Sequence, residues 1–345
     1  MKKVSLIILA LLLLGGISAV YLYNYIQEFG QSAGHSGDQN QALTIILQKG
    51  DSANSVLTKL EKVGIVQQPL IAKFWLKLNP EYNRVKTGYY QFESGTKVQE
   101  IFLALSQGKV KQFSITLIEG LTLRQWFTAI NANDMITNDI VNSKSLYESV
   151  VTSTESFCTN SYSSLEGCLL ADTYFFDYKT KASDIIRRAY KSMQTVIDAQ
   201  WTSRYLDTAY QTKYEMLIMA SIIEKETAVE SERDLISGVF DNRLKRKMRL
   251  QTDPTVIYGV GETFDGNLTR KHLRQKTPYN TYVIKGLPIT PIAMAGEASI
   301  IAAAKPQLTE AVYFVAKGDG THQFSETLAE HNAAVRKYQL RKGKE

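Results

Sequence analysis

The chain of 345 residues is long enough for two or three compact units, since a domain usually spans about 100 to 200 residues. Hydrophobic residues make up 44% and charged residues 21% of the sequence, which is typical of chains that fold in water and excludes a largely disordered or polytopic membrane protein. The net charge of +6 is modest, and because basic and acidic residues are interleaved, we expect no nucleic-acid binding.

The N-terminus carries an apolar run from Val4 to Ile26, preceded by Lys2 and Lys3. Its length matches the roughly 20 residues that cross a bilayer. A cleaved signal peptide has similar features and stays open as an alternative. The uncleaved anchor is favoured because apolarity continues past the small residues of a cleavage site and ends in tyrosines, which are typical of a membrane interface. We therefore predict a single pass of the cytoplasmic (inner) membrane over residues 1–26, with the rest of the chain periplasmic or otherwise extracytoplasmic.

Residues 27–43 are rich in Gly, Ser, Gln and Asn, a composition that predicts a flexible tether. A short strand over 44–47, the turn Lys49-Gly50-Asp51-Ser52 and an amphipathic helix ending at Gly64 follow it. In this order of elements, residues 44–118 resemble the LysM-like module, a glycan-binding fold. A purely structural spacer is the alternative interpretation.

The sequence has two cysteines, Cys158 and Cys168, joined by a polar, turn-forming loop. An oxidising compartment would permit a disulfide, but spacing alone does not fix the distance between the Cα atoms, so two unpaired thiols remain the alternative. None of the four histidines pairs at the spacing of metal ligands, and no CxxC motif occurs. We therefore expect neither a metal site nor a cofactor.

An unbroken apolar run from Met216 to Ile223 leads into the acidic pair Glu224 and Glu226. The run predicts a buried helix that ends in carboxylates. At 100° per residue, Glu226 continues the apolar face of Ile222 and Ile223, whereas Glu224 points to another side. At most one of the two acids should therefore project into a given cleft.

A carboxyl group at the rim of an apolar face is partly desolvated, which raises its pKa toward neutrality. A general acid for glycosidic-bond cleavage requires such a pKa, so Glu226 is a candidate catalytic residue. An ordinary helix end with solvated Glu-Lys-Glu charges is the alternative. These residues alone do not decide between the two.

A second predicted helix follows, and its end carries the densest basic cluster, RLKRKMR at 243–249. Such a run is most often a solvated helix face. It supports no more than a weak preference for anionic envelope polymers or lipid headgroups.

Two polar segments beyond this helix are candidate substrate-binding loops. Their candidate residues are Gln251, Thr252, Asp253, Tyr279, Asn280 and Tyr282. The first three can hydrogen-bond sugar hydroxyls, although an Asp before a proline also fits a turn or helix cap. The last three combine planar rings with an amide, as carbohydrate grooves do, although the same residues are common in turns.

Five motifs carry a more specific resemblance. They are ASIIEKET at 220–227, SERD at 231–234, RLQTDPTVIYG at 249–259, YNTY at 279–282 and KGLPITPIA at 285–293. Together they resemble the MltG/YceG-like endolytic peptidoglycan transglycosylases, and the resemblance extends over essentially the whole chain. It places the catalytic glutamate of that family on Glu226. The segment at 165–174 departs from the family pattern at Cys168 and Ala171, which usually are an aromatic residue and a proline.

The resemblance implies a carbon–oxygen lyase acting on polysaccharide. Glu226 would protonate the oxygen of the MurNAc–GlcNAc bond and then, as a carboxylate, activate the C6 hydroxyl of MurNAc, giving a 1,6-anhydromuramoyl end. The family also suggests control of strand length beside penicillin-binding proteins. Two alternatives stay open: a lysozyme-like hydrolase with Asp253 as the second carboxylate, and a non-catalytic peptidoglycan-binding scaffold.

The predicted architecture is α+β. An anchor over 1–26 and a tether over 27–43 precede a small LysM-like unit over 44–118. A larger catalytic domain over 119–345 would place the helix that carries Glu226 against loops from 251 to 259 and from 279 to 291.

Overall fold

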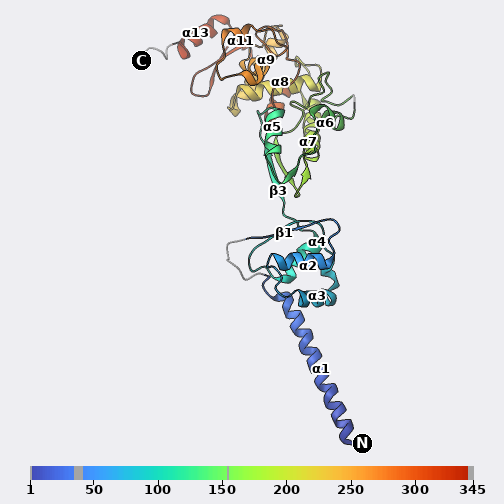
Figure 1. Ribbon diagram of the computed structural model, residues 1–345. Helices are drawn as coiled ribbons and strands as arrows, with labels where there is room; N and C mark the ends of the chain where they lie inside the picture. Colours follow the sequence, from blue (N-terminus) through green and yellow to red (C-terminus); the bar gives the residue numbers. More distant parts are fainter. Residues whose placement is uncertain (1, 35–41, 154, 341–345) are drawn as a thin grey trace. The chain divides into compact units, whose positions relative to one another are not determined.

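The computed structural model describes residues 2–34, 42–153 and 155–340 (Figure 1). By its packing the chain divides into two compact units. The first comprises Met1–Phe113 with Phe175–Tyr178, and the second comprises Ser114–Tyr174 with Lys179–Glu345. The predicted mixture of helices and short strands is confirmed.

The first unit begins with a long apolar helix. Among the described residues it is the one helix long and apolar enough to cross a membrane. The elements of this unit are α1 (Lys2–Gln31), β1 (Leu43–Leu47), α2 (Ala53–Lys62), α3 (Pro69–Leu78), the 3-10 helix η1 (Pro80–Tyr82), β2 (Gly88–Phe92) and α4 (Val98–Gln107). Strands β1 and β2 pair antiparallel, with Ile45 opposite Tyr90.

The predicted tether is wrong in its first residues, because α1 continues to Gln31. Ile26 and Phe29 are buried in the core of the first unit. Gly30 packs so closely on Trp75 that a Cβ atom there would lie 2.7 Å from the indole Nε1. Apolar packing of this kind keeps the segment helical. The polar composition of the segment did not predict this packing. Residues 35–41 of the predicted tether lie outside the described residues.

The turn before α2 is organised by Asp51. Its carboxylate accepts hydrogen bonds from the Gln48 N–H at 2.7 Å, from the Ser55 hydroxyl at 2.6 Å and from Lys59 Nζ at 2.5 Å. The bond with Lys59 is the main cause that lowers the pKa of Asp51 to about 2. Ser52 then caps α2 by accepting the Ser55 N–H. The predicted turn thus starts a helix whose apolar face meets the strand pair.

The second unit is mainly helical. Its helices are α5 (Leu123–Asn131), α6 (Ser143–Val150), α7 (Ala182–Ser203), α8 (Lys213–Glu226), η2 (Glu230–Glu232), α9 (Arg233–Lys245), α10 (Asp253–Val260), η3 (Gly261–Thr263), α11 (Arg270–Arg274), α12 (Glu297–Ala304) and α13 (Leu328–Tyr338). Its strands are β4 (Ile136–Thr137), β6 (Thr180–Lys181), β7 (Tyr313–Ala316) and β8 (His322–Ser325). β4 pairs parallel with β6, and β7 antiparallel with β8. A further pair consists of β3 (Phe113–Leu117) and β5 (Asp172–Phe176).

Helix α8 lies at the centre of the second unit and contacts α7, α9, α10 and α12. Thr212 caps its start by accepting the Glu215 N–H at 3.1 Å. Every residue from 216 to 223 is buried, so the helix is apolar on all sides over that length. It ends where Thr227 adopts an extended backbone, which leaves Glu226 as the last helical residue.

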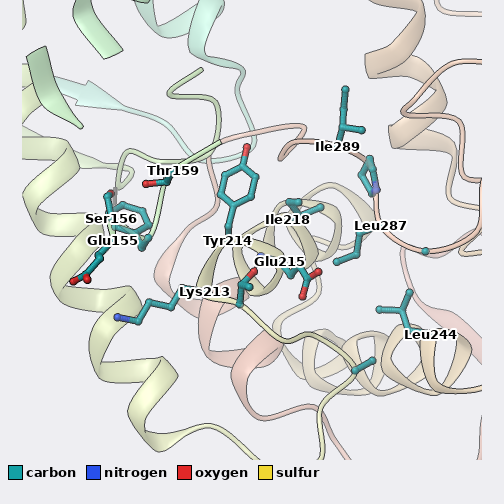
Figure 2. Close-up of a pocket in the computed structure, with 15 residues that line it drawn as sticks. Glu155, Ser156, Thr159, Lys213, Tyr214, Glu215, Ile218, Leu244, Leu287 and Ile289 are labelled. Atoms are coloured by element: carbon teal, nitrogen blue, oxygen red, sulfur yellow. Dashed lines mark hydrogen bonds between the residues drawn. The ribbon is translucent and has the colours of Figure 1, made fainter. Parts of the chain in front are cut away.

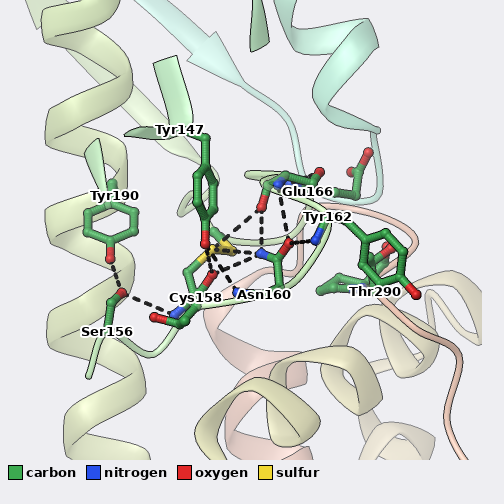
Figure 3. Close-up of a disulfide and its surroundings, with 12 residues drawn as sticks. Tyr147, Ser156, Cys158, Asn160, Tyr162, Glu166, Tyr190 and Thr290 are labelled. Atoms are coloured by element: carbon green, nitrogen blue, oxygen red, sulfur yellow. Dashed lines mark hydrogen bonds between the residues drawn. A yellow bond between two sulfur atoms is a disulfide. The ribbon is translucent and has the colours of Figure 1, made fainter. Parts of the chain in front are cut away.

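Cys158 and Cys168 form a disulfide, with their Cα atoms 5.9 Å apart (Figure 3). Asn160 organises the loop between them by donating from Nδ2 to the carbonyls of Cys158 and Ser164, at 2.9 Å each. The Tyr147 hydroxyl donates to the same Cys158 carbonyl at 3.1 Å. This settles the pairing that the sequence left open.

Candidate active site around Glu226

A cleft of about 570 Å³ in the second unit contains Glu226. Four other residues singled out from the sequence line it: Gln251, Thr252, Asp253 and Tyr282. They come from the end of α8, the start of α10 and the loop after α11. The fold thus brings together side chains that are far apart in the sequence, with Glu226 and Tyr282 separated by 56 positions.

Glu226 lies half-buried at the rim of the α8 core, after the fully buried Ile222 and Ile223. Burial is the main cause that raises its pKa, and the charge of Asp253 acts in the same direction. A hydrogen bond from the Thr252 hydroxyl to Oε1, and the electrostatic influence of nearby His322 and Arg243, act in the opposite direction. The net effect favours the protonated acid.

Thr252 is held in place by a network of buried threonines. Its N–H donates to Thr281 Oγ1 at 3.0 Å, and Thr255 Oγ1 donates to its carbonyl at 2.8 Å. The Oγ1 atoms of Thr255 and Thr281 lie 2.8 Å apart. Gln251 precedes it with a φ of 49°, a left-handed conformation that turns the chain into α10. The Thr252 hydroxyl is thereby fixed toward Glu226.

Asp253 is the first residue of α10 rather than its cap, which is Thr252. The side chain of Thr252 makes no capping bond, because its hydroxyl serves Glu226 instead. Asp253 is exposed and accepts a hydrogen bond from the Tyr282 hydroxyl at 2.7 Å. A carboxylate and a phenol are therefore coupled on the wall of the cleft.

Tyr279 and Asn280 were predicted to bind substrate, but neither lines this cleft. Asn280 is 1% exposed, and its Nδ2 donates to the carbonyls that close α11, at 2.7 Å for Gln275. The Tyr279 hydroxyl lies 3.0 Å from Thr290 Oγ1, and its ring packs edge-on against Tyr258. The motif has the composition of a sugar-binding loop, but these two side chains satisfy internal groups, and only Tyr282 of the three faces the cleft.

Sequence reasoning missed two features of the cleft. Arg243 opens the basic run that was interpreted as solvated, yet it is 7% exposed and donates from Nε to the Val312 carbonyl at 2.6 Å and from an Nη to the Leu250 carbonyl at 2.7 Å. His322 lines the cleft with Nδ1 2.8 Å from Glu232 Oε2. Glu232 belongs to the SERD motif, but only the fold brings it next to His322.

Glu224 points away from the cleft, as the helical spacing predicts. Its Oε2 accepts the Gly296 N–H at 3.0 Å and the Ser299 hydroxyl at 2.7 Å, at the start of α12. An acid at the N-terminus of a helix is stabilised by the helix dipole. Glu224 therefore has a local structural role.

A second carboxyl group with a raised pKa, Glu166, was not predicted. It is 5% exposed and accepts the Leu123 N–H at 3.0 Å and the Tyr258 hydroxyl at 3.1 Å. Burial raises its pKa to about 7. It lines a separate cleft, on the α5 side of α10.

A third cleft, of about 740 Å³, lies around the start of α8 (Figure 2). Its residues come from the loop at 155–159, the first turns of α8 and the loop at 286–289. None of the seven candidate residues lines it. Among the residues that the structure describes, no group of three or more His, Cys, Asp or Glu side chains is placed to hold a metal ion.

The profile of the YceG-like family matches residues 45–337. The chain belongs to the YceG-like family. An endolytic murein transglycosylase of Bacillus subtilis (strain 168) is 32% identical over 313 residues, covering 87% of this chain and 86% of that protein. One of Streptococcus pneumoniae serotype 2 (strain D39) is 24% identical over 361 residues, covering 96% of this chain and 63% of that protein. The crystal structure of a putative yceG-like protein from Listeria monocytogenes matches with a TM-score of 0.55 and 30% identity, over 85% of this chain and 99% of that one. The family resemblance predicted from the motifs is confirmed.

Proposed function

We propose that this chain cuts peptidoglycan glycan strands internally by transglycosylation, with Glu226 as the acid and base. The observation that carries the proposal is a carboxyl group of raised pKa at the edge of a cleft, in a family whose curated relatives are named endolytic murein transglycosylases. A protonated carboxyl near neutral pH is what the first chemical step requires.

In that step Glu226 gives its proton to the oxygen between MurNAc C1 and GlcNAc, and the C1–O bond breaks. The carboxylate then takes the proton of the MurNAc C6 hydroxyl while O6 bonds to C1. The nucleophile belongs to the substrate, so one protein carboxyl group suffices and no water is consumed. The product end is a 1,6-anhydromuramoyl group, and repeated cuts would limit strand length.

The neighbours of Glu226 suit both halves of this cycle. Burial favours the acid at the start, whereas the Thr252 hydroxyl and the electrostatic influence of His322 and Arg243 stabilise the carboxylate that forms. Gln251 and the Asp253–Tyr282 pair line the same cleft, and their proposed role is to bind sugar hydroxyls.

The proposal extends to the rest of the chain. Helix α1 anchors it in the cytoplasmic membrane by a single pass, with the residues that follow this helix on the outer side, where an oxidising environment maintains the disulfide. The strand, helix, helix, strand order of the first unit fits a LysM-like role in holding glycan. Penicillin-binding proteins, which make the strands, are the proposed partners.

Product mass spectrometry on purified glycan strands tests the proposal. The wild-type chain should release anhydromuramoyl ends, and Glu226→Gln should release none while keeping the fold. Glu230→Gln, an exposed acid in η2, is the matched control and should behave as wild type.

The same measurement separates the alternatives. Asp253 lies in the cleft, so a lysozyme-like hydrolase remains the second candidate, and each new muramoyl end it makes would carry the mass of one additional water. Products that contain this water in place of anhydro ends would overturn the transglycosylase assignment. Binding of strands without any release would instead support a non-catalytic scaffold.

A further inference from the structure

A cleft of about 780 Å³ lies beside the Glu226 cleft in the second unit. Two pairs of consecutive residues are divided between the clefts. Glu226 and Asp253 line the first, whereas Lys225 and Pro254 line the second. The two clefts therefore flank one ridge, formed by the end of α8 and the start of α10.

The second cleft combines apolar and polar surfaces. Its apolar surface includes Pro254, Ile257 and Ile292, and its polar wall on α5 includes Gln125 and Thr128. A sugar ring presents apolar C–H faces and a rim of hydroxyl groups, so it needs surfaces of both kinds. Ligand sites typically pair apolar walls with a few placed polar groups in this way.

The inner end of this cleft is rigidly held. Glu166 and Tyr258 both line it, and the hydrogen bond between them joins the loop closed by the Cys158–Cys168 disulfide to α10. The second oxygen of Glu166 accepts the Leu123 N–H at the start of α5. Three elements around the cleft are thereby fixed before any ligand arrives, which lowers the entropic cost of binding.

The cations at this cleft are already engaged by protein groups. Lys225 Nζ donates to the Gly120 carbonyl at 3.0 Å, and Arg124 forms an ion pair with Glu262. Both side chains are therefore held at the cleft by contacts within the protein.

We propose that the second cleft binds the sugar residues that adjoin the disaccharide being cut. This inference rests on the proposed function, because an enzyme that cuts inside a strand meets glycan on both sides of the broken bond. The ridge between the clefts is then the point over which the strand passes, with Glu226 on one side and Tyr258 on the other.

Blocking the cleft from α5 tests the proposal. Thr128 and Ala129 are both exposed on that helix, but only Thr128 lines the cleft. Thr128→Trp should raise KM for long, peptide-free glycan strands about tenfold with little change in kcat, the signature of lost uniform binding. Ala129→Trp is the matched control and should leave KM unchanged. On the shortest oligomer that wild type cuts, both variants should equal wild type.

Equal KM values for the two tryptophan variants on long strands would overturn the proposal. So would a loss for Thr128→Trp that appears only when stem peptides are attached, since that would assign the cleft to peptide. Calorimetry of the same strands with each tryptophan placed in a Glu226→Gln chain gives a readout that needs no turnover. A chain that binds strands through this cleft but never cuts them would contradict the proposed activity alone.

Discussion

Two carboxyl groups of the second unit, the half-buried Glu226 and the buried Glu166, share a raised pKa but differ in their surroundings. Both oxygens of Glu166 accept hydrogen bonds from the protein, and the residue is 5% exposed. Among the described residues only the Thr252 hydroxyl donates to Glu226, on Oε1, so Oε2 is left for a ligand. A raised pKa thus marks both groups, whereas access to substrate distinguishes the acid that can react from the one that holds the fold.

The largest effect should come from replacing the accessible acid. Glu226→Gln should lower kcat by at least about 10³-fold, because the amide cannot donate a proton to the leaving oxygen. Its stability should stay within about 1 kcal/mol of wild type, since no buried donor other than Thr252 loses its acceptor. Single-turnover kinetics of the detergent-solubilised chain measure the rate of the chemical step, and chemical unfolding measures its stability. If the variant retained activity, Glu226 would not be the reactive acid, and it would no longer differ from Glu166 in function.

Replacing the buried Glu166 should change the free energy of unfolding rather than the catalytic rate. The pKa of Glu166 is about 7 in the folded chain against an ordinary 4.5, so the folded state binds the extra proton between these values. The bound proton therefore stabilises the folded state relative to the unfolded chain. This contribution to the free energy of unfolding is fully present below pH 4.5, is lost as the pH rises through about 7, and amounts to about 3 kcal/mol. Glu166→Gln should remove this slope. Unfolding titrations from pH 4 to 8 check it, and an unchanged slope would show that the burial of Glu166 is not its source.

The disulfide should contribute to the surroundings of Glu166 without acting on Glu226. Replacing Cys158 and Cys168 together by serine should lower the free energy of unfolding by about 2 to 3 kcal/mol, because a short loop is no longer closed in the unfolded chain. The kcat of the purified chain should be preserved. A fall in kcat that matches the fall in stability would indicate that the two acids are coupled.

The smallest effect should follow removal of the Thr252 hydroxyl. That hydrogen bond lowers the pKa of Glu226, so Thr252→Val should raise this pKa further. The acid form then persists to higher pH, and the alkaline limb of the kcat/KM profile should move upward. Thr255→Val removes a hydroxyl of the same network that does not contact Glu226, and should leave the limb in place.

Local patterns predicted the parts of this protein that depend on neighbours in sequence. The apolar run at 216–223 indicated a buried helix, and its period separated Glu226 from Glu224, as the contacts of Glu224 with α12 confirm. Composition was less reliable at residues 27–31. Their polar residues predicted a tether, but packing on Trp75 keeps this segment helical. Polar residues can stay helical when the apolar residues among them have a surface to cover.

The sequence by itself determined the apolar N-terminal helix, the central helix with its terminal acid, and, through five motifs, the family. Only the tertiary structure decided which polar residues share the cleft. It brought in Arg243 and His322 and directed Tyr279 and Asn280 to internal partners. The physical reason is that helix periodicity acts over a few residues, whereas a cleft is formed by loops whose directions depend on long-range packing and on the need to satisfy buried polar groups.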